Sequence, residues 1–310
     1  PAAPPVLPQR FAPAPGIYTI SANQLQGLTI ALPEMFNYFH HLEPERRIGH
    51  AMFVYHLAPR PPADWVAQCA LPVAPLSPAD LAEGLGTQEY QLLTLDCEQS
   101  WLIPPGNGWY VLPHAYDGWG KRQAEQGRLA YEQPQSGYAP AFALYEWFDE
   151  QTELPDTITV YAAPSVWPVS QVLAAGIQIP TPVDIGDALT FLGYTTPTDP
   201  TSGTPWSVTT YWQVRARPTA ALSLMAHLLE GTGIPLAVGD GLGVPFNQWQ
   251  PGSLILQRHH FAIPENTSAT RTWLQVGAYT LEDLERAPIQ HAGQIVGDRL
   301  LVAEIEVTTP

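Results

Sequence analysis

The sequence predicts a mostly β protein of the α+β class that ends in an antiparallel β-sandwich. Three observations lead to this fold class. Runs that alternate apolar and polar residues recur from about residue 181, turns rich in Gly, Pro and Asp separate them, and no long helical period accompanies them. With 310 residues the chain is long enough for two or three domains. We expect a partial α/β unit, then a mixed α/β region, then the sandwich.

The N-terminal part reads as a Pro/Ala-rich linker over 1–15 followed by a partial α/β unit over 16–58. A strand is expected at 17–21 and another at 48–57. Pro33 suits the first turn of a helix between them. That helix carries apolar residues at helical spacing, namely Met35, Phe36, Phe39 and Leu42. Such a strand-helix-strand unit cannot bury both faces of a parallel sheet by itself.

A mixed α/β region is expected over 59–153. Ser77 can cap a helix that starts at Pro78. Strands are predicted at 91–97, 109–113 and 142–147, and the sequence PPGNG at 104–108 predicts a turn. A linker over 154–180 then leads to the sandwich.

The sandwich is expected over 181–310. Its strands are predicted at 189–194, 206–214, 221–229, 253–263, 272–279 and 300–307. Trp206 and Trp212 share one face of their strand at period two, which favours places in the core. About 130 residues of such strands are typical of a two-sheet sandwich, so residues 178–310 are expected to fold alone.

The charge excludes some classes of partner. The formal net charge is −16, and Lys121 is the only lysine. Such a surface repels phosphate backbones and anionic lipid headgroups, so nucleic acid is not an expected partner. No run of eighteen apolar residues and no signal peptide is found, so export would depend on sequence upstream of Pro1.

Several segments resemble a known family. They are GIYTISANQLQG at 16–27, RIGHAMFVYH at 47–56, QCALPVAPL at 68–76, DCEQSW at 96–101 and GWYVL at 108–112. They resemble the soluble tail of polytopic bacterial glycosyltransferases of the protein mannosyltransferase-like (family 39-like) superfamily. WQPG at 249–252, QRH at 257–259 and VGAY at 276–279 resemble a sandwich module appended to such tails. The resemblance implies a periplasmic or cell-surface region, anchored through a catalytic membrane part upstream.

Two cysteines, Cys69 and Cys97, stand 28 positions apart. In the extracytoplasmic compartment that the resemblance implies, they are expected to form a disulfide. Closing that loop would stabilise the fold by about 3.5 kcal/mol in the chain-entropy model. The alternative is a pair of buried free thiols. No neighbouring Cys or His completes a zinc site.

Catalytic motifs are lacking. A glycoside hydrolase needs two facing carboxylates, and the candidates show no diagnostic neighbourhood: Asp117, Glu125, Glu132, Glu146, Asp149 and Glu150. The histidine pairs at 40–41 and 259–260 read as ordinary structure, and the loop GDGLG at 239–243 reads as a turn. Calcium at Asp240, or metal at His259 with His227, is a weaker alternative. No cofactor, metal or catalytic residue is assigned.

Exposed aromatic rings are the expected ligand platforms, since sugar C–H faces stack on them. Trp249 with Asn247 is the first candidate, and Trp109 and Trp119 follow, although a core position is the alternative for each. We therefore predict a non-catalytic region that binds or positions a glycan or a glycosylated acceptor beside an upstream membrane domain. The alternatives are a surface protein that self-assembles or joins an envelope complex, and an independent glycoside hydrolase.

Overall fold

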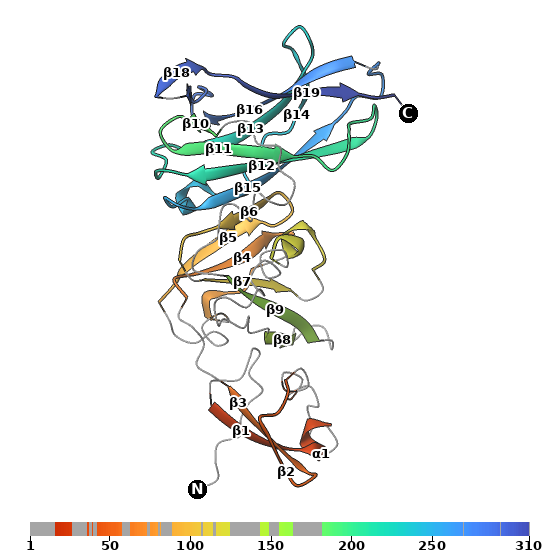
Figure 1. Ribbon diagram of the computed structural model, residues 1–310, viewed down its shortest axis with the longest axis vertical. Coiled ribbons are helices and arrows are strands. Elements are labelled where there is room, and N and C mark those ends of the chain that lie inside the picture. Colours follow the sequence, from red (N-terminus) through yellow and green to blue (C-terminus); the bar gives the residue numbers. More distant parts are fainter. Residues whose placement is uncertain are drawn as a thin grey trace.

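The computed structural model shows a mostly β protein, as predicted. A three-stranded sheet lies at the N-terminal end, a five-stranded sheet in the middle, and a seven-stranded and a four-stranded sheet at the C-terminal end (Figure 1). The structure describes residues 16–26, 36, 39, 42–57, 63–72, 75–79, 81, 89–106, 108–113, 116–124, 143–148, 155–163, 182–268, 270–291 and 293–309. The predicted linker at 1–15, the pair His40–His41 and most of the helix expected from Pro33 lie outside these ranges.

The N-terminal sheet has the order β1-β3-β2, with β1 at Gly16–Ser21, β2 at Arg46–Ile48 and β3 at Met52–Leu57. Helix α1, Ala22–Leu25, follows β1 directly and starts with a capping box between Ser21 and Gln24. Phe39 is buried against Ile20 and Tyr55, and Phe36 and Leu42 pack against the same cluster. These three residues therefore cover the sheet, as their spacing predicted.

Two details of this unit differ from the prediction. The sheet is antiparallel, since β3 pairs with both β1 and β2 in that sense. The strand predicted at 48–57 is in fact β2, a turn and β3, because Gly49 adopts the left-handed conformation (φ 60°) and reverses the chain. A hairpin needs no crossover helix between its strands, so the unit is not a fragment of a parallel α/β sheet.

The middle sheet has the order β5-β4-β7-β9-β8. Its strands are β4 Trp65–Leu71, β5 Gln91–Asp96, β7 Gly108–Pro113, β8 Ala143–Phe148 and β9 Pro155–Ala163. β4 runs parallel to β5 and β7, and the other pairs are antiparallel. A Cβ on Gly108 would stand 2.1 Å from the Trp65 ring, so glycine is required where β7 passes this indole.

Three strands of this part depart from the prediction. β9 occupies Pro155–Ala163, inside the segment expected to be a linker, because Thr157, Thr159 and Tyr161 alternate with apolar residues as in a sheet. β4 was not predicted, since its first five residues are buried and show no alternation. β6, Ser100–Ile103, was also missed, for the same reason.

The sandwich consists of a seven-stranded sheet, β18-β17-β10-β11-β12-β15-β6, and a four-stranded sheet, β14-β13-β16-β19. The first sheet contains β10 Val183–Ile185, β11 Leu189–Thr195, β12 Pro205–Val214, β15 Leu254–Ala262, β17 Ile289–His291 and β18 Gln294–Gly297. The second contains β13 Leu222–Leu229, β14 Pro235–Val238, β16 Thr270–Thr280 and β19 Leu300–Val307. All six predicted strands are present, and all pairs within these sheets are antiparallel.

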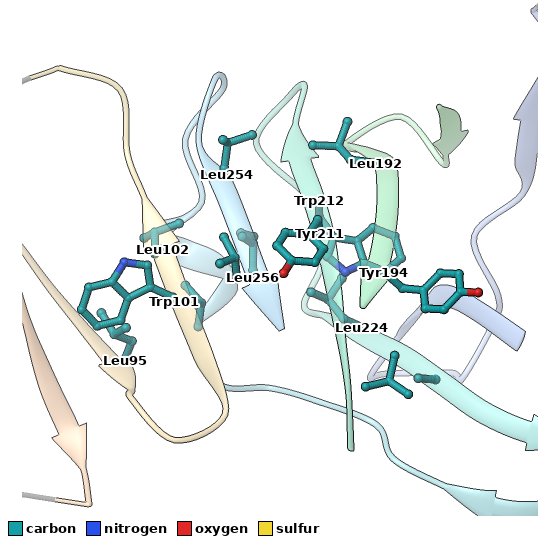
Figure 2. Packing of buried hydrophobic residues seen from close by; sticks show 14 of the residues in the cluster. Leu95, Trp101, Leu102, Leu192, Tyr194, Tyr211, Trp212, Leu224, Leu254 and Leu256 are labelled. Atoms are coloured by element: carbon teal, nitrogen blue, oxygen red, sulfur yellow. The ribbon is translucent and has the colours of Figure 1, made fainter. Parts of the chain in front are cut away.

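The cores of the middle region and the sandwich are continuous. β6 leaves the middle region and pairs with β15, so that Leu102 lies opposite Ile255. Leu102 belongs to the sandwich side, whereas Trp101 stacks on Tyr110 of β7 with ring centroids 4.4 Å apart. Figure 2 follows this packing from Leu95 and Trp101 through Leu102 and Leu256 to Trp212 and Leu224. The sandwich sheet therefore takes an edge strand from outside the predicted range 181–310.

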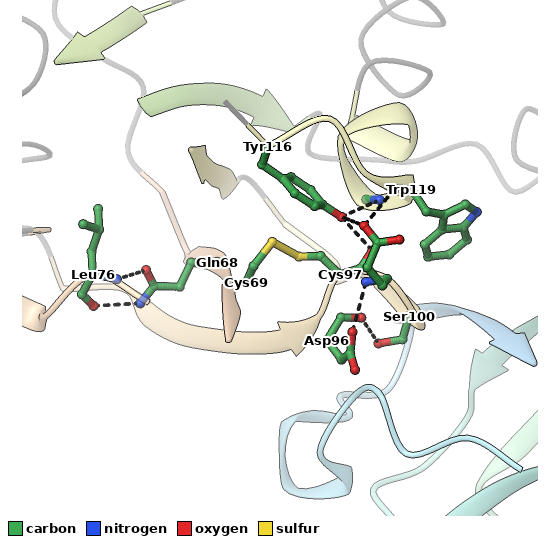
Figure 3. The surroundings of a disulfide bond; sticks show 10 residues. Gln68, Cys69, Leu76, Asp96, Cys97, Ser100, Tyr116 and Trp119 are labelled. Atoms are coloured by element: carbon green, nitrogen blue, oxygen red, sulfur yellow. Dashed lines mark hydrogen bonds between the residues drawn. A yellow bond between two sulfur atoms is a disulfide. The ribbon is translucent and has the colours of Figure 1, made fainter. Parts of the chain in front are cut away.

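Cys69 and Cys97 form a disulfide, which confirms the prediction. Both are buried, and the bond joins β4 to the residue that follows β5 (Figure 3). Glu98 accepts hydrogen bonds from the Tyr116 hydroxyl (2.8 Å) and the Trp119 amide (3.3 Å) beside it. Burial, and then the hydrogen bond to Glu98, raise the pKa of Tyr116, so its hydroxyl remains a donor. Among the described helices, none has the length and apolar character to cross a membrane.

Candidate functional site

The aromatic residues predicted as ligand platforms are buried. Trp249 is 2% exposed, Trp109 5% and Trp119 8%. A ring with so little exposed area cannot stack on a sugar without leaving its place in the fold. The structure therefore contradicts these three rings as platforms and supports the alternative of core positions. Trp206 and Trp212 are buried, as predicted.

Trp249 instead anchors the junction between the middle sheet and the sandwich. It follows the short 3-10 helix η2, Phe246–Gln248, and donates from Nε1 to the carbonyl of Val244. The neighbouring Gln248 side chain accepts from the Thr94 amide (2.9 Å) and donates to the Thr94 hydroxyl (3.2 Å). Asn247 is exposed, and its backbone carbonyl accepts from Arg217. Because these contacts engage the other polar groups of the loop, the Asn247 side chain is the main group that it offers to a ligand.

A different group of polar side chains lies on the outer face of the four-stranded sheet, where Trp273 is exposed but Ser223 and Gln275 are each only 1% exposed. The alternate residues Leu224, Ala226 and Leu228 of β13 face the core. The opposite face is therefore built from the other cross-strand pairs of β13 and β16, and four of them define it: Ser223–Tyr279, Met225–Gly277, His227–Gln275 and Leu229–Trp273. We call these eight residues, with Asp240, the outer-face site.

Asp240 organises one end of the outer-face site. Its carboxylate accepts hydrogen bonds from His227 Nε2 and from the Tyr279 hydroxyl, both at 3.0 Å. Burial alone raises the pKa of Asp240, but the hydrogen bonds from His227 and Tyr279 outweigh it and bring the pKa below its ordinary value. Asp240 is thus an anion at the edge of the sheet, and it links His227 of β13 to Tyr279 of β16.

The other end of the site presents an exposed indole. Trp273 is 39% exposed and lies opposite Glu304 of β19, which pairs with Arg271 at 3.1 Å. Between the two ends, Gln275 Nε2 and His227 Nδ1 are buried and have no hydrogen-bond partner within the described residues. The site thus combines an aromatic face, a charged pair and buried polar groups that are not fully satisfied.

This arrangement does not provide the usual elements of catalysis. The second ring nitrogen of His227 contacts no hydroxyl or thiol in the described part of the chain, so the His227–Asp240 pair has no nucleophile to activate there. Of the six carboxylate candidates, Asp117 is exposed and Glu146 lies on β8. Glu125, Glu132, Asp149 and Glu150 are outside the described residues.

The predicted alternatives for metal binding are not supported by the geometry. Both carboxylate oxygens of Asp240 already accept hydrogen bonds. His259 is buried in the sandwich core, where its nitrogens contact the Gly239 carbonyl and the Thr210 hydroxyl. No group of three or more His, Cys, Asp or Glu residues suited to a metal is assembled in the described ranges.

The segment GDGLG at 239–243 is not the turn that was predicted. Gly241 exchanges backbone hydrogen bonds with Leu224, so the segment runs along β13 as an extended edge. A Cβ on Gly241 would stand 2.3 Å from the Gln257 side chain, and one on Gly243 would stand 2.4 Å from the Ser100 hydroxyl. These glycines allow close packing between strands and do not cradle a phosphate.

One signal in the sequence could have located the outer-face site. In the predicted strand 272–279, Thr272, Leu274 and Val276 must face the core at period two. Trp273 and Gln275 then face outward, which identifies Trp273 as an exposed ring. Polar neighbours in the sequence favoured Trp249, but they do not indicate whether a ring is exposed. The alternation along the strand does indicate it.

Comparison with known proteins does not assign the chain to a family. No protein-family model matches it, and a search of curated proteins gives no match. Among solved structures, the crystal structure of the C-terminal domain of wzt aligns with 45% of this chain and 84% of its own, at 8% identity and a TM-score of 0.30. A similarity at this level carries no argument, so the function must be inferred from the chain's own residues.

Proposed function

We propose that this chain is a non-catalytic, extracytoplasmic region that binds a glycan, and that it belongs to a membrane glycosyltransferase-like protein. The observation that carries the binding role is the exposed Trp273 of the outer-face site, which lies beside the Arg271–Glu304 ion pair on the four-stranded sheet. The link to a glycosyltransferase rests on the sequence resemblance at 16–57 and 68–112.

The extracytoplasmic placement is supported by the disulfide. Cys69 and Cys97 are joined and buried, and structural disulfides persist in oxidising compartments. With a single lysine and a net charge of −16, the chain repels polyanions, which are therefore poor ligands. A neutral or weakly charged glycan fits this surface best.

A sugar also suits the chemistry of the outer-face site. Trp273 offers a flat ring for stacking, and the Arg271–Glu304 pair beside it offers both a donor and acceptors for hydroxyl groups. Pyranose rings present an apolar C–H face with hydroxyl groups at the rim, which matches a ring flanked by polar side chains. The rigid β13–β16 pair keeps these groups in place.

The test is a glycan array followed by titration calorimetry on the intact chain. Trp273→Ala should weaken binding of the best glycan by about 1 kcal/mol, or roughly five-fold in Kd, because a stacked ring is lost. Ile48→Ala, which shortens another exposed apolar side chain on the N-terminal sheet, should leave Kd unchanged.

The proposal fails if the intact chain binds no glycan on the array. It also fails at this site if Trp273→Ala binds as tightly as the parent chain. An unchanged unfolding midpoint of Trp273→Ala shows that any loss of binding does not come from a loss of folding.

A further inference from the structure

The edges of both sandwich sheets meet in one consecutive segment. β18 is the outer strand of the seven-stranded sheet, and β19 is the outer strand of the four-stranded sheet. Only Asp298 and Arg299 separate them in the chain, and Figure 1 shows both strands running along the C-terminal end of the molecule. Edge strands carry backbone groups that can pair with another chain.

This segment is apolar where edges are usually protected. All four residues of β18 are exposed, with Ile295 at 70% and Val296 at 63%, and Leu301 of β19 is 49% exposed. β18 contains no charged residue and no proline, which are the common means of blocking edge-to-edge contact. Asp298 and Arg299 carry charges between the two strands, and Glu304 and Glu306 carry charges further along β19, where they would limit pairing at that end.

The segment is also complementary to itself. Its sequence from 295 to 302 is Ile-Val-Gly-Asp-Arg-Leu-Leu-Val. If two copies run antiparallel about a twofold axis between residues 298 and 299, Asp298 of each copy lies opposite Arg299 of the other. The same register places Val296 opposite Leu301 and Ile295 opposite Val302. Opposite charges and apolar pairs directly across two strands stabilise a sheet.

We propose that this chain forms a twofold-symmetric dimer by antiparallel pairing of residues 295–302. Such an isologous contact closes on itself and leaves no free copy of the segment, so it gives dimers and not fibres. It covers Ile295, Val296 and Leu301 together. The outer-face site takes no part in the pairing, so dimer formation and glycan binding can be tested separately.

A charge swap tests the proposal on the full chain by sedimentation velocity over a range of concentrations. The parent chain should dimerise. Asp298→Arg should raise the dimer Kd at least about tenfold, because each of the two symmetric charge pairs then sets one guanidinium against another. The double change Asp298→Arg with Arg299→Asp should restore the dimer. Glu265→Arg makes the same change in net charge on an exposed turn and should have no effect.

A second pair of variants tests the apolar part. Val296→Lys should abolish the dimer, whereas Val238→Lys, on the edge strand β14 and 51% exposed, should not. Circular dichroism and a thiol count of zero will show that each variant is folded. The proposal is overturned if the parent chain is monomeric up to roughly millimolar concentration, where only very weak association remains. It is also overturned by a dimer that survives Asp298→Arg or by a charge swap that fails to restore it.

Discussion

At the scale of the residue, His259 shows how a buried polar group is accommodated. Its ring is 1% exposed and lies between the Gly239 carbonyl and Thr210 Oγ1, which stands 2.7 Å from Nε2 and also accepts from the Trp212 indole. Burial lowers the pKa of His259 to about 4, despite the opposing effect of the Gly239 carbonyl and Asp240. The ring is therefore neutral in the folded protein over the physiological range.

This pKa predicts a dependence of stability on pH. The unfolded chain binds a proton at His259 near pH 6.5, whereas the folded chain does so near pH 4. Between these values the unfolded state holds more protons, so the free energy of unfolding should fall as pH drops from 6.5 to 4, by up to about 3 kcal/mol. Urea unfolding at several pH values measures this.

His259→Gln provides the control for that prediction. An amide in place of the ring does not titrate, so the slope between pH 6.5 and 4 should flatten relative to the parent chain, whatever the other carboxylates and histidines contribute. If both proteins show the same slope, His259 is not the group responsible.

At the scale of the element, the two faces of β6 pack against two parts of one continuous core. Trp101 packs on Tyr110 of the middle sheet, and Leu102 lies opposite Ile255 in the sandwich. The hydroxyl of Tyr110 donates to the Leu102 carbonyl at 2.7 Å, which ties β7 to β6. Four residues thus close an edge of the sandwich and cover part of the middle sheet.

The position of β6 predicts how fragments of the chain behave. Residues 178–310 were expected from the sequence to fold alone, but this fragment lacks β6 and exposes the edge of β15 with Leu256. Its unfolding midpoint should lie well below that of residues 63–310, and it should aggregate more readily. Thermal unfolding of the two fragments compares them, and equal midpoints would show that β6 contributes little.

The disulfide is tested in the same region. Mass spectrometry of the unreduced chain should show two hydrogens fewer than the reduced chain, and reduction should lower the free energy of unfolding by about 3.5 kcal/mol. Cys69→Ala with Cys97→Ala removes the bond without a reductant and should behave as the reduced chain does. Two free thiols in native protein would contradict both the structure and the proposed location.

At the scale of the whole molecule, the sequence predicts alternating strands well and fully buried strands poorly. Strands such as β12 carry a clear period of two and were found with nearly correct ends. β4 and β6 are buried on both faces, so their sequences carry no alternation. The pairing of β6 with β15 joins residues about 150 positions apart, and no local pattern specifies it.

The candidate site was harder to predict for a related reason. Trp249 is buried and Trp273 is exposed. The burial of Trp249 depends on the junction around Gln248 and Thr94, which are far apart in the sequence. The disulfide could be predicted because two cysteines allow one pairing. The Asp240 network joins a glycine-rich edge, β13 and β16, which are distant in the sequence.

The short connection between β5 and β6 joins the middle sheet to the sandwich. Three residues, Cys97–Gln99, link the two strands, and the disulfide, the Gln99 carbonyl and the Gln248–Thr94 contacts hold both sides. We therefore expect the middle sheet and the sandwich to keep a fixed orientation relative to each other. A glycan bound at the outer-face site, as proposed above, would then be held in a fixed orientation relative to the middle sheet.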